Sequence, residues 1–377
     1  MDVKIAGLDL ELIHIPGETD DQIAVFWPEK KALFCADDFY KAFPNLYAIR
    51  GTPFRSLRKW TQSLDKMRAL RPEFLVPSHT RPIQGASKIF TLLTDYRDAV
   101  QYVHDQTVRY MNKDLHPELI AHKVHLPTKL RENPYLLEFY GTVPWSVKGL
   151  FSGYQGWFSG DAVELNPHTP KETALRWVKL AGGVEPVLKE AEEVLESDPQ
   201  WALQLATSAL HVEQFNRKAV ELRVKALFDL GNSQTSANGR NYYLTVAYET
   251  LGKIDIKVDP RQRRATVMET PIDRLFYLMS LRLKAEQCSE LDEMVSFRFK
   301  DTNETVLFHL RNGVMDVLLN RKLAMKQPDI EVEVTSDTWR HLVAGEKNTL
   351  WTAATSEIQA KPSLLEFKRV MDCFEKE

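Results

Sequence analysis

The chain has 377 residues, which is enough for two or three domains of ordinary size. A hydrophobic content of 44% and a charged content of 27% are typical of a soluble globular protein. The net charge of −3 without a long basic run argues against nucleic-acid binding, and no apolar run approaches the roughly 20 residues that span a bilayer.

The three cysteines, Cys35, Cys288 and Cys373, lie far apart. Their odd number and their spacing predict neither a disulfide framework nor a cysteine-based zinc cluster. This usage favours a reducing compartment, so we expect a soluble chain and prefer the cytoplasm. No signal peptide is visible, because residues 1–4 lead straight into a strand pattern, and any targeting signal would precede Met1.

Residues 3–95 have the pattern of an α/β fold. Short apolar or alternating runs predict strands at residues 10–15, 23–27, 32–36 and 74–77. Residues 56–70 have helical spacing, with Leu57, Trp60, Leu64 and Met67 on one face.

From about residue 86 the hydrophobic period becomes helical. The predicted helices cover residues 89–111, 170–180, 184–197, 199–211 and 216–230. Asp198 is a candidate N-cap, with Pro199 in the first turn. Short connections between these helices predict antiparallel neighbours in a stack.

Residues 254–270 look like a charged linker, and their basic run at 261–264 is better explained by solvation than by nucleic-acid binding. After Pro271 the pattern predicts a small α+β unit. Its elements are a helix at 272–283, strands at 294–299, 305–310 and 330–334, and helices at 338–345 and 364–374.

Three possible metal ligands each follow a predicted strand. Glu18 lies in a Pro-Gly-Glu-Thr turn, Asp37 follows 19 residues later, and His79 comes after the strand at 74–77. Carboxylate oxygen and imidazole nitrogen are both ligands that zinc accepts. The alternatives are a solvated turn glutamate, an aspartate pair that caps the segment after residue 38, and an isolated histidine.

This strand-turn-strand resembles the metallo-β-lactamase-fold hydrolases, which usually have a histidine at the turn. Glutamate at that position, followed by Ala36-Asp37 where the family has Ala-Glu, resembles the alkyl sulfatases. The resemblance implies that Glu18, Asp37 and His79 bind zinc, and two Zn²⁺ ions form the family's site. The family's H-x-H-x-D-H loop is absent from these residues. We therefore expect a fragment or a variant without the first half of the fold, unable to close a two-zinc site alone.

Residues 43–51 resemble the alkyl sulfatase segment His-Asn-Leu-Tyr-x-x-Arg-Gly. The resemblance implies that Asn45 and Arg50 bind the sulfate group, and an arginine fork matches two oxygens of a tetrahedral anion. For Arg50 alone, a surface or structural ion pair is the alternative. Arg55 and Trp60 extend the match, and we expect them to be structural.

The resemblance continues to the end of the chain through segments such as residues 140–143, 154–160 and 241–244. It implies a multidomain chain: a partial α/β metallo-β-lactamase sandwich, an all-α helical dimerisation domain and a small α+β sterol-carrier-protein-like domain. We place these three domains at residues 1–95, 96–255 and 265–377. In the last one, the candidates to line a hydrophobic tunnel are Leu307, Leu310, Val314, Val317 and Leu318, and a closed core is equally compatible.

One residue departs from the family pattern: Trp145 stands where alkyl sulfatases have a histidine. Tryptophan donates one N–H but does not shuttle a proton at neutral pH. His116, His122 and His125 have no carboxylate pattern beside them, so we expect them at a surface or an interface rather than in a metal site.

The implied function is zinc-dependent hydrolysis of long-chain primary alkyl sulfates by metal-activated water, carried out by a homodimer. The alternative is a dimerising, lipid-binding scaffold that has lost its metal loop. Hydrolysis of another ester remains open, because this fold hosts many reactions.

Overall fold

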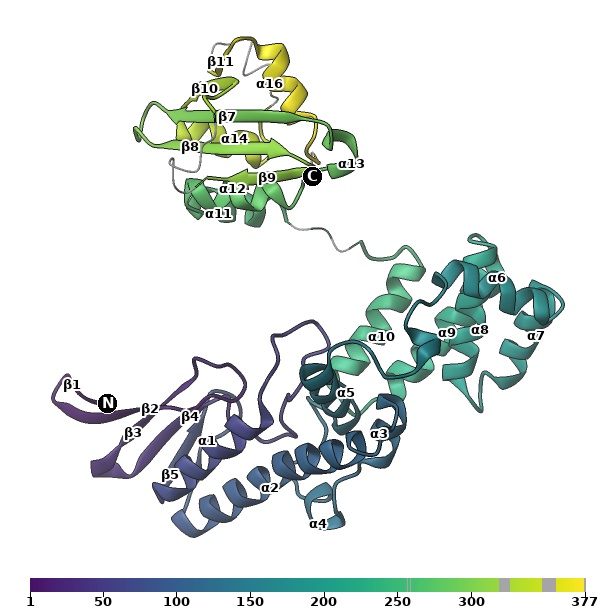
Figure 1. Cartoon of the computed structure of the whole chain (residues 1–377). Helices are drawn as coiled ribbons and strands as arrows, with labels where there is room; N and C mark the ends of the chain where they lie inside the picture. Colours follow the sequence, from purple (N-terminus) through teal and green to yellow (C-terminus); the bar gives the residue numbers. More distant parts are fainter. Residues whose placement is uncertain (256, 258, 319–325, 348–356, 376–377) are drawn as a thin grey trace. The chain divides into compact units, whose positions relative to one another are not determined.

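The computed structural model describes residues 1–255, 257, 259–318, 326–347 and 357–375 (Figure 1). The chain forms two compact units, residues 1–255 and 256–377. The predicted boundary near residue 95 lies inside one continuous helix, α2 (Ala86–Met111), so the division of the first unit into two domains stays a prediction.

The first unit begins with a sheet of six strands in the order β1 to β6. The strands are β1 (Asp2–Ile5), β2 (Leu8–His14), β3 (Ile23–Trp27), β4 (Ala32–Ala36), β5 (Phe74–Pro77) and β6 (Ile83–Gln84). Neighbouring strands are antiparallel except β4 and β5, which are parallel. Strands β2, β4 and β5 therefore run in the same direction and end at the same edge of the sheet.

Two helices pack against this sheet: α1 (Leu57–Ala69) and α2. The predicted apolar face of α1 is confirmed, because Trp60, Leu64 and Met67 are buried in one core with Leu33 and Leu75 of the sheet. Each side chain of this size contributes about 1.5–3 kcal/mol when it leaves water. This core fixes the positions of the loops that follow the carboxyl ends of β2, β4 and β5.

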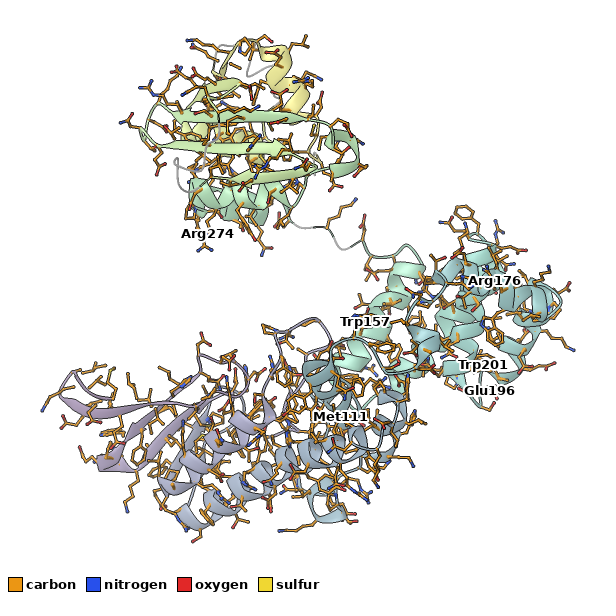
Figure 2. The ribbon with its side chains drawn as sticks, viewed as in Figure 1. Met111, Trp157, Arg176, Glu196, Trp201 and Arg274 are labelled. Carbon is orange, nitrogen blue, oxygen red and sulfur yellow. The ribbon has the colours of Figure 1, made fainter. Side chains whose placement is uncertain are left out.

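The rest of the first unit is helical. Its helices are α3 (Pro117–Lys123), α4 (Thr128–Arg131), α5 (Val143–Gln155), α6 (Pro170–Leu180), α7 (Val184–Val194), α8 (Pro199–Val212), α9 (Arg217–Ser233) and α10 (Ala237–Thr250), with short 3₁₀ turns η1 (Pro28–Lys30) and η2 (Ala162–Glu164). The predicted cap is confirmed, since Asp198 accepts a hydrogen bond from the Trp201 N–H at 3.0 Å. Trp157 and Trp201 remain 73% and 43% exposed on this helical part (Figure 2).

The second unit is the predicted α+β fold. Its elements are α11 (Pro260–Glu269), α12 (Ile272–Ser280), α13 (Ala285–Cys288), β7 (Asp292–Phe299), β8 (Thr305–Arg311), β9 (Val314–Val317), β10 (Ile330–Val334), α14 (Ser336–Val343), β11 (Gln359–Lys361) and α16 (Leu364–Met371). The sheet has the order β11-β10-β7-β8-β9, with β10 and β7 parallel. Aromatic contacts join its helices to the sheet: the ring centroids of Phe276, Phe297 and Trp339 lie 4.7–5.2 Å apart.

The predicted linker at residues 254–270 is wrong in its second half, which forms α11. Asp259 caps this helix by accepting the Arg261 N–H at 2.9 Å. Arg340 of α14 donates to the carbonyl oxygens of Val267 and Thr270 at 2.6 and 2.5 Å. These tertiary contacts stabilise a helix that has no strong apolar stripe of its own.

None of the helices that the structure describes is both long enough and apolar enough to span a bilayer.

Candidate functional site

The shared edge of β2, β4 and β5 collects the loops that carry Glu18, Asp37 and His79. His79 Nε2 lies 3.5 Å from Asp37 Oδ1. That oxygen is buried and accepts no hydrogen bond from any described residue. Ala36, directly before Asp37, has a left-handed φ of 49°, a conformation that costs a non-glycine residue about 1–2 kcal/mol. Such backbone strain is typical of functional sites.

Glu18 is held by Arg55, which stands just before α1. Arg55 Nη1 lies 3.0 Å from Glu18 Oε1, and the two side chains are only 10% and 13% exposed. The same Nη1 donates to the carbonyl oxygen of Asn45. Burial raises the pKa of Glu18, the Arg55 charge opposes this shift, and the nearby Asp37 carboxylate adds to it. Arg55 therefore joins a predicted metal ligand to the predicted sulfate-binding loop.

Asp38 supports the turn that carries Glu18. Its side chain is fully buried, and Oδ1 accepts the Glu18 N–H at 3.1 Å and the Gln22 amide at 2.9 Å. A Cβ atom on Gly17 would lie 2.1 Å from Oδ1, so only glycine permits this close approach. Burial raises the pKa of Asp38 to about 8, with smaller contributions from the Glu18 and Asp37 charges.

This raised pKa predicts a pH-dependent stability of the metal-free chain. Between about pH 4 and pH 8 the unfolded chain releases the Asp38 proton while the folded chain keeps it, so stability falls as pH rises. Urea unfolding measures the free energy of unfolding at pH 6 and at pH 8. We expect it to fall between these two pH values by about 1–3 kcal/mol more in the wild type than in Asp38→Asn. Asp21→Asn, an exposed control, keeps the wild-type slope. Equal slopes for all three proteins would contradict the burial of a protonated Asp38.

The predicted sulfate-binding residues lie on one loop, and Arg55 links Asn45 of this loop to Glu18. Asn45 is 1% exposed, its N–H donates to the Tyr40 hydroxyl at 2.7 Å, and its side-chain nitrogen has no hydrogen-bond partner among the described residues. Arg50 is exposed, and its Nη2 donates to the Tyr140 hydroxyl at 3.4 Å. The loop thus offers one buried donor and one guanidinium at the surface.

Gly141 lets the residue 139–142 segment approach this loop. A Cβ atom there would lie 2.1 Å from the carbonyl oxygen of Pro44, which is main chain and cannot rotate away. We expect Gly141→Ala to destabilise the protein by about 1–3 kcal/mol through overpacking. Urea unfolding measures the loss, and an unchanged midpoint would show that the two segments do not touch.

The residues fit a metal ion in part. Among the described residues, no three His, Cys, Asp or Glu side chains form a group that could hold one. Asp37 and His79 do lie together, and Glu18 is near enough to raise the pKa of Asp38. The buried atoms Asp37 Oδ1 and Asp38 Oδ2 accept no hydrogen bond from described residues. Carboxylate and imidazole donors suit zinc. Glu18 would have to exchange its bond with Arg55 for a metal.

Arg55 was expected to be structural, and it forms a buried ion pair with Glu18. Sequence reasoning missed one contributor to this site. Asp38 was expected at most to cap the following segment, yet it holds the Glu18 turn. The Asp-Asp doublet was the one visible signal for Asp38. Trp145 is half-buried, and its ring would lie 3.0 Å from a Cβ atom on Gly239.

The sheet matches a known class of fold. Residues 2–79 match the model of the metallo-beta-lactamase superfamily. Residues 116–253 match the model described as alkyl sulfatase dimerisation, and residues 261–377 match the one described as alkyl sulfatase C-terminal.

The chain belongs to the alkylsulfatase family. It is 34% identical over 390 residues to the linear primary-alkylsulfatase of Pseudomonas sp. (strain ATCC 19151), covering 100% of this chain and 73% of that protein. It is 28% identical to an (R)-specific secondary-alkylsulfatase of Pseudomonas sp., covering 90% of this chain and 52% of that one.

The fold has a close counterpart among solved structures. The stereoselective inverting sec-alkylsulfatase Pisa1 from Pseudomonas sp. superposes with a TM-score of 0.86 at 24% identity, covering 100% of this chain and 60% of that one. The chain therefore spans between about half and three quarters of the relatives it matches.

Proposed function

We propose that these 377 residues supply part of the metal site, the sulfate-binding loop and the later domains of a zinc-dependent alkylsulfatase. The substrates would be long-chain primary alkyl sulfates, and the working form a homodimer. The observation that carries this proposal is that the loops of Glu18, Asp37 and His79 meet at one edge of the sheet, where Arg55 links Glu18 to Asn45. The names of the relatives support the substrate class.

The residues have separate roles in this proposal. Asp37, His79 and Glu18 would hold zinc, with further ligands from outside these residues. When bound, zinc lowers the pKa of a coordinated water and supplies a nucleophile near neutral pH. Arg50 and the Asn45 amide would bind and orient the sulfate oxygens, and Arg55 would position Glu18. The buried Asp38 would hold the turn rather than take part in the reaction.

The homodimer has its own support in the helical part. The dimerisation model matches residues 116–253, and this region exposes large apolar side chains. Trp177 and Leu180 of α6 are 66% and 82% exposed. Aromatic and aliphatic side chains of this kind are typical of surfaces that a partner covers.

Elemental analysis of the protein as the cell makes it, at its natural length, tests the proposal. We expect close to two zinc ions per chain, together with release of inorganic sulfate from decyl sulfate. In Asp37→Asn, both the zinc content and the sulfate release should fall. A zinc-free protein that releases no sulfate would contradict the proposal.

A second candidate function, a non-catalytic dimerising and lipid-binding scaffold, is favoured by one observation. By the resemblance, Trp145 stands where the family has a histidine. Its ring packs toward Gly239 of α10, and an indole is not a titratable group. Trp145→His decides between the two: a rise in sulfate release supports an enzyme with a weakened proton donor. A protein that binds no zinc with either residue supports the scaffold.

A further inference from the structure

The segment of residues 139–142 lies between the sulfate-binding loop, residues 43–51, and the start of helix α10. On the side of the loop, a Cβ atom on Gly141 would lie 2.1 Å from the carbonyl oxygen of Pro44, so the two main chains are in contact. On the side of the helix, the Ala237 N–H donates to the carbonyl oxygen of Phe139 at 2.9 Å. The segment therefore connects the loop to α10.

Ser236 makes a second bond between α10 and this segment. Its hydroxyl donates to the carbonyl oxygen of Tyr140 at 2.7 Å. Its oxygen also accepts the Gly239 N–H at 3.4 Å, as the N-cap of α10. An N-cap residue needs only the accepted bond. The donated bond is an addition, made by a side chain that is 2% exposed, and it fixes the main chain of Tyr140.

The Tyr140 side chain contacts the loop at two points. Its hydroxyl accepts a hydrogen bond from Arg50 Nη2 at 3.4 Å. Its ring meets the ring of Tyr40 edge-on, with the centroids 6.0 Å apart. Tyr40 is 4% exposed, and its hydroxyl accepts the Asn45 N–H at 2.7 Å. The residue that Ser236 holds therefore borders Arg50 directly and Asn45 through one tyrosine.

The position of Asn45 matters because of its free donor. Its side-chain nitrogen is buried and has no hydrogen-bond partner among the described residues. An unpaired buried donor is unfavourable, and an oxygen atom of a bound ligand would satisfy it. Such a donor acts only from the correct place, since a displacement of about 1 Å can lower a rate on the order of a hundredfold. A contact that fixes Asn45 therefore affects the reaction without touching the substrate.

Helix α10 is packed closely enough to act as a fixed point. Gly239 in its first turn lies against the ring of Trp145, and Leu244 further along lies against Gly231 of α9, each so close that a Cβ atom on the glycine would be 3.0 Å away. These residues belong to the region that matches the alkyl sulfatase dimerisation model. A helix of that region thus supports the loop.

We propose that Ser236 is a positioning residue for the sulfate-binding loop. Its hydroxyl fixes Tyr140, and Tyr140 fixes the Asn45 amide through the ring of Tyr40. This inference deepens the proposed function and rests on it for the reaction, whereas the contact itself needs neither zinc nor hydrolysis. It assigns a part in sulfate binding to a serine that lies 96 positions from Tyr140 in the sequence.

Steady-state kinetics of the natural-length protein tests the role in the reaction. Ser236→Gly removes the donated bond and costs the helix little, because glycine is an accepted N-cap residue. We expect kcat/KM for decyl sulfate to fall by about tenfold, with a rise in KM, because the sulfate is held less well. A loss of folded protein would lower kcat alone. Ser236→Thr keeps a hydroxyl and should recover kcat/KM to within about threefold of the wild type.

A second background and a matched control make this test specific. In Asn45→Ala, the change Ser236→Gly should lower kcat/KM by less than about twofold more, because the amide that it positions is already absent. Ser233 provides the control, since its exposed hydroxyl donates to the Leu230 carbonyl oxygen at 2.9 Å at the end of α9. Ser233→Ala should keep the wild-type KM. Equal losses for Ser236→Gly with and without the Asn45 amide would overturn the proposal.

Hydrogen exchange measured by mass spectrometry on the same proteins tests the contact without any reaction. Peptides that cover residues 43–51 should exchange at least about fivefold faster in Ser236→Gly than in the wild type and in Ser233→Ala. Unchanged exchange in these peptides overturns the proposal. Faster exchange in Ser236→Gly, in a protein whose wild type releases no sulfate, would reject the proposed function and still support the positioning of the loop by Ser236.

Discussion

Replacing Arg55 by methionine is expected to destabilise the protein by about 3–5 kcal/mol. The substitution leaves Glu18 buried without its counter-charge, and removing one member of a buried ion pair costs this much because the remaining charge is not compensated. It also removes the bond from Arg55 to the Asn45 carbonyl oxygen. Urea unfolding of the metal-free chain measures the change.

The double variant Arg55→Met, Glu18→Gln should recover a large part of that loss, since no charge then stays buried. Arg58→Ala, on an exposed position of α1, is the matched control and should change stability by less than about 0.5 kcal/mol. A loss below 1 kcal/mol in Arg55→Met, or a double variant less stable than Arg55→Met, would show that the pair is not buried as described.

Replacing Arg50 by glutamine is expected to lower kcat/KM for decyl sulfate by about 10²–10³ in the natural-length protein, if the loop binds sulfate as proposed. This is the loss typical for removal of one preorganised donor from a developing negative charge. Arg50→Lys should recover little, because a lysine keeps the charge but not the fork of two N–H groups.

Tyr140→Phe provides the matched control for this arginine. It removes the hydroxyl that Arg50 contacts at 3.4 Å and leaves the guanidinium in place. We expect a loss of less than tenfold, and zinc content unchanged in all three variants. Full activity of Arg50→Gln would contradict a role of Arg50 in sulfate binding and would favour the alternative, a surface or structural ion pair.

The short strands of the first unit could be predicted from sequence because turn residues bound each apolar run. The strands at 23–27, 32–36 and 74–77 have the predicted bounds. Their directions also place Glu18, Asp37 and His79 at one edge, as their positions after strands had indicated.

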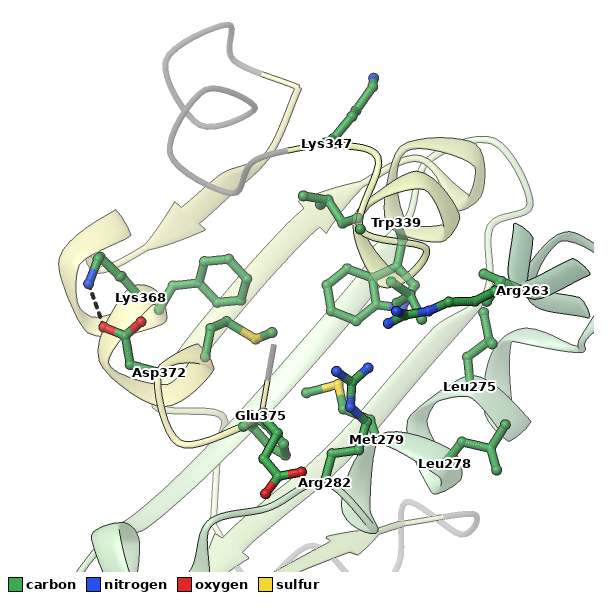
Figure 3. Close-up of a pocket in the computed structure, with 17 residues that line it drawn as sticks. Arg263, Leu275, Leu278, Met279, Arg282, Trp339, Lys347, Lys368, Asp372 and Glu375 are labelled. Carbon is green, nitrogen blue, oxygen red and sulfur yellow. Dashed lines mark hydrogen bonds and ion pairs between the residues drawn. The ribbon is translucent and has the colours of Figure 1, made fainter. Parts of the chain in front are cut away.

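What the sequence could not give depends on contacts between distant segments. The Arg55–Glu18 pair joins residues 37 positions apart, and the burial of Asp38 needs the Gly17 turn packed against it. Helix α11 lacks a strong apolar stripe, so its charged composition indicated a linker, although Asp259-Pro260 was a readable start signal. A cavity in the second unit is lined by side chains of helices α11, α12, α14 and α16 (Figure 3). None of the five residues predicted to line a tunnel belongs to this lining, and the hydrophobic period of each helix alone does not reveal it.

Zinc titration of the metal-free 377-residue chain tests most directly whether the edge of β2, β4 and β5 is a metal site. We expect one zinc ion to bind, with at least tenfold weaker affinity in Asp37→Asn and in His79→Ala, and no change in the exposed control His122→Ala. Absence of zinc binding, or equal affinity in all four proteins, would contradict the assignment of these side chains as metal ligands.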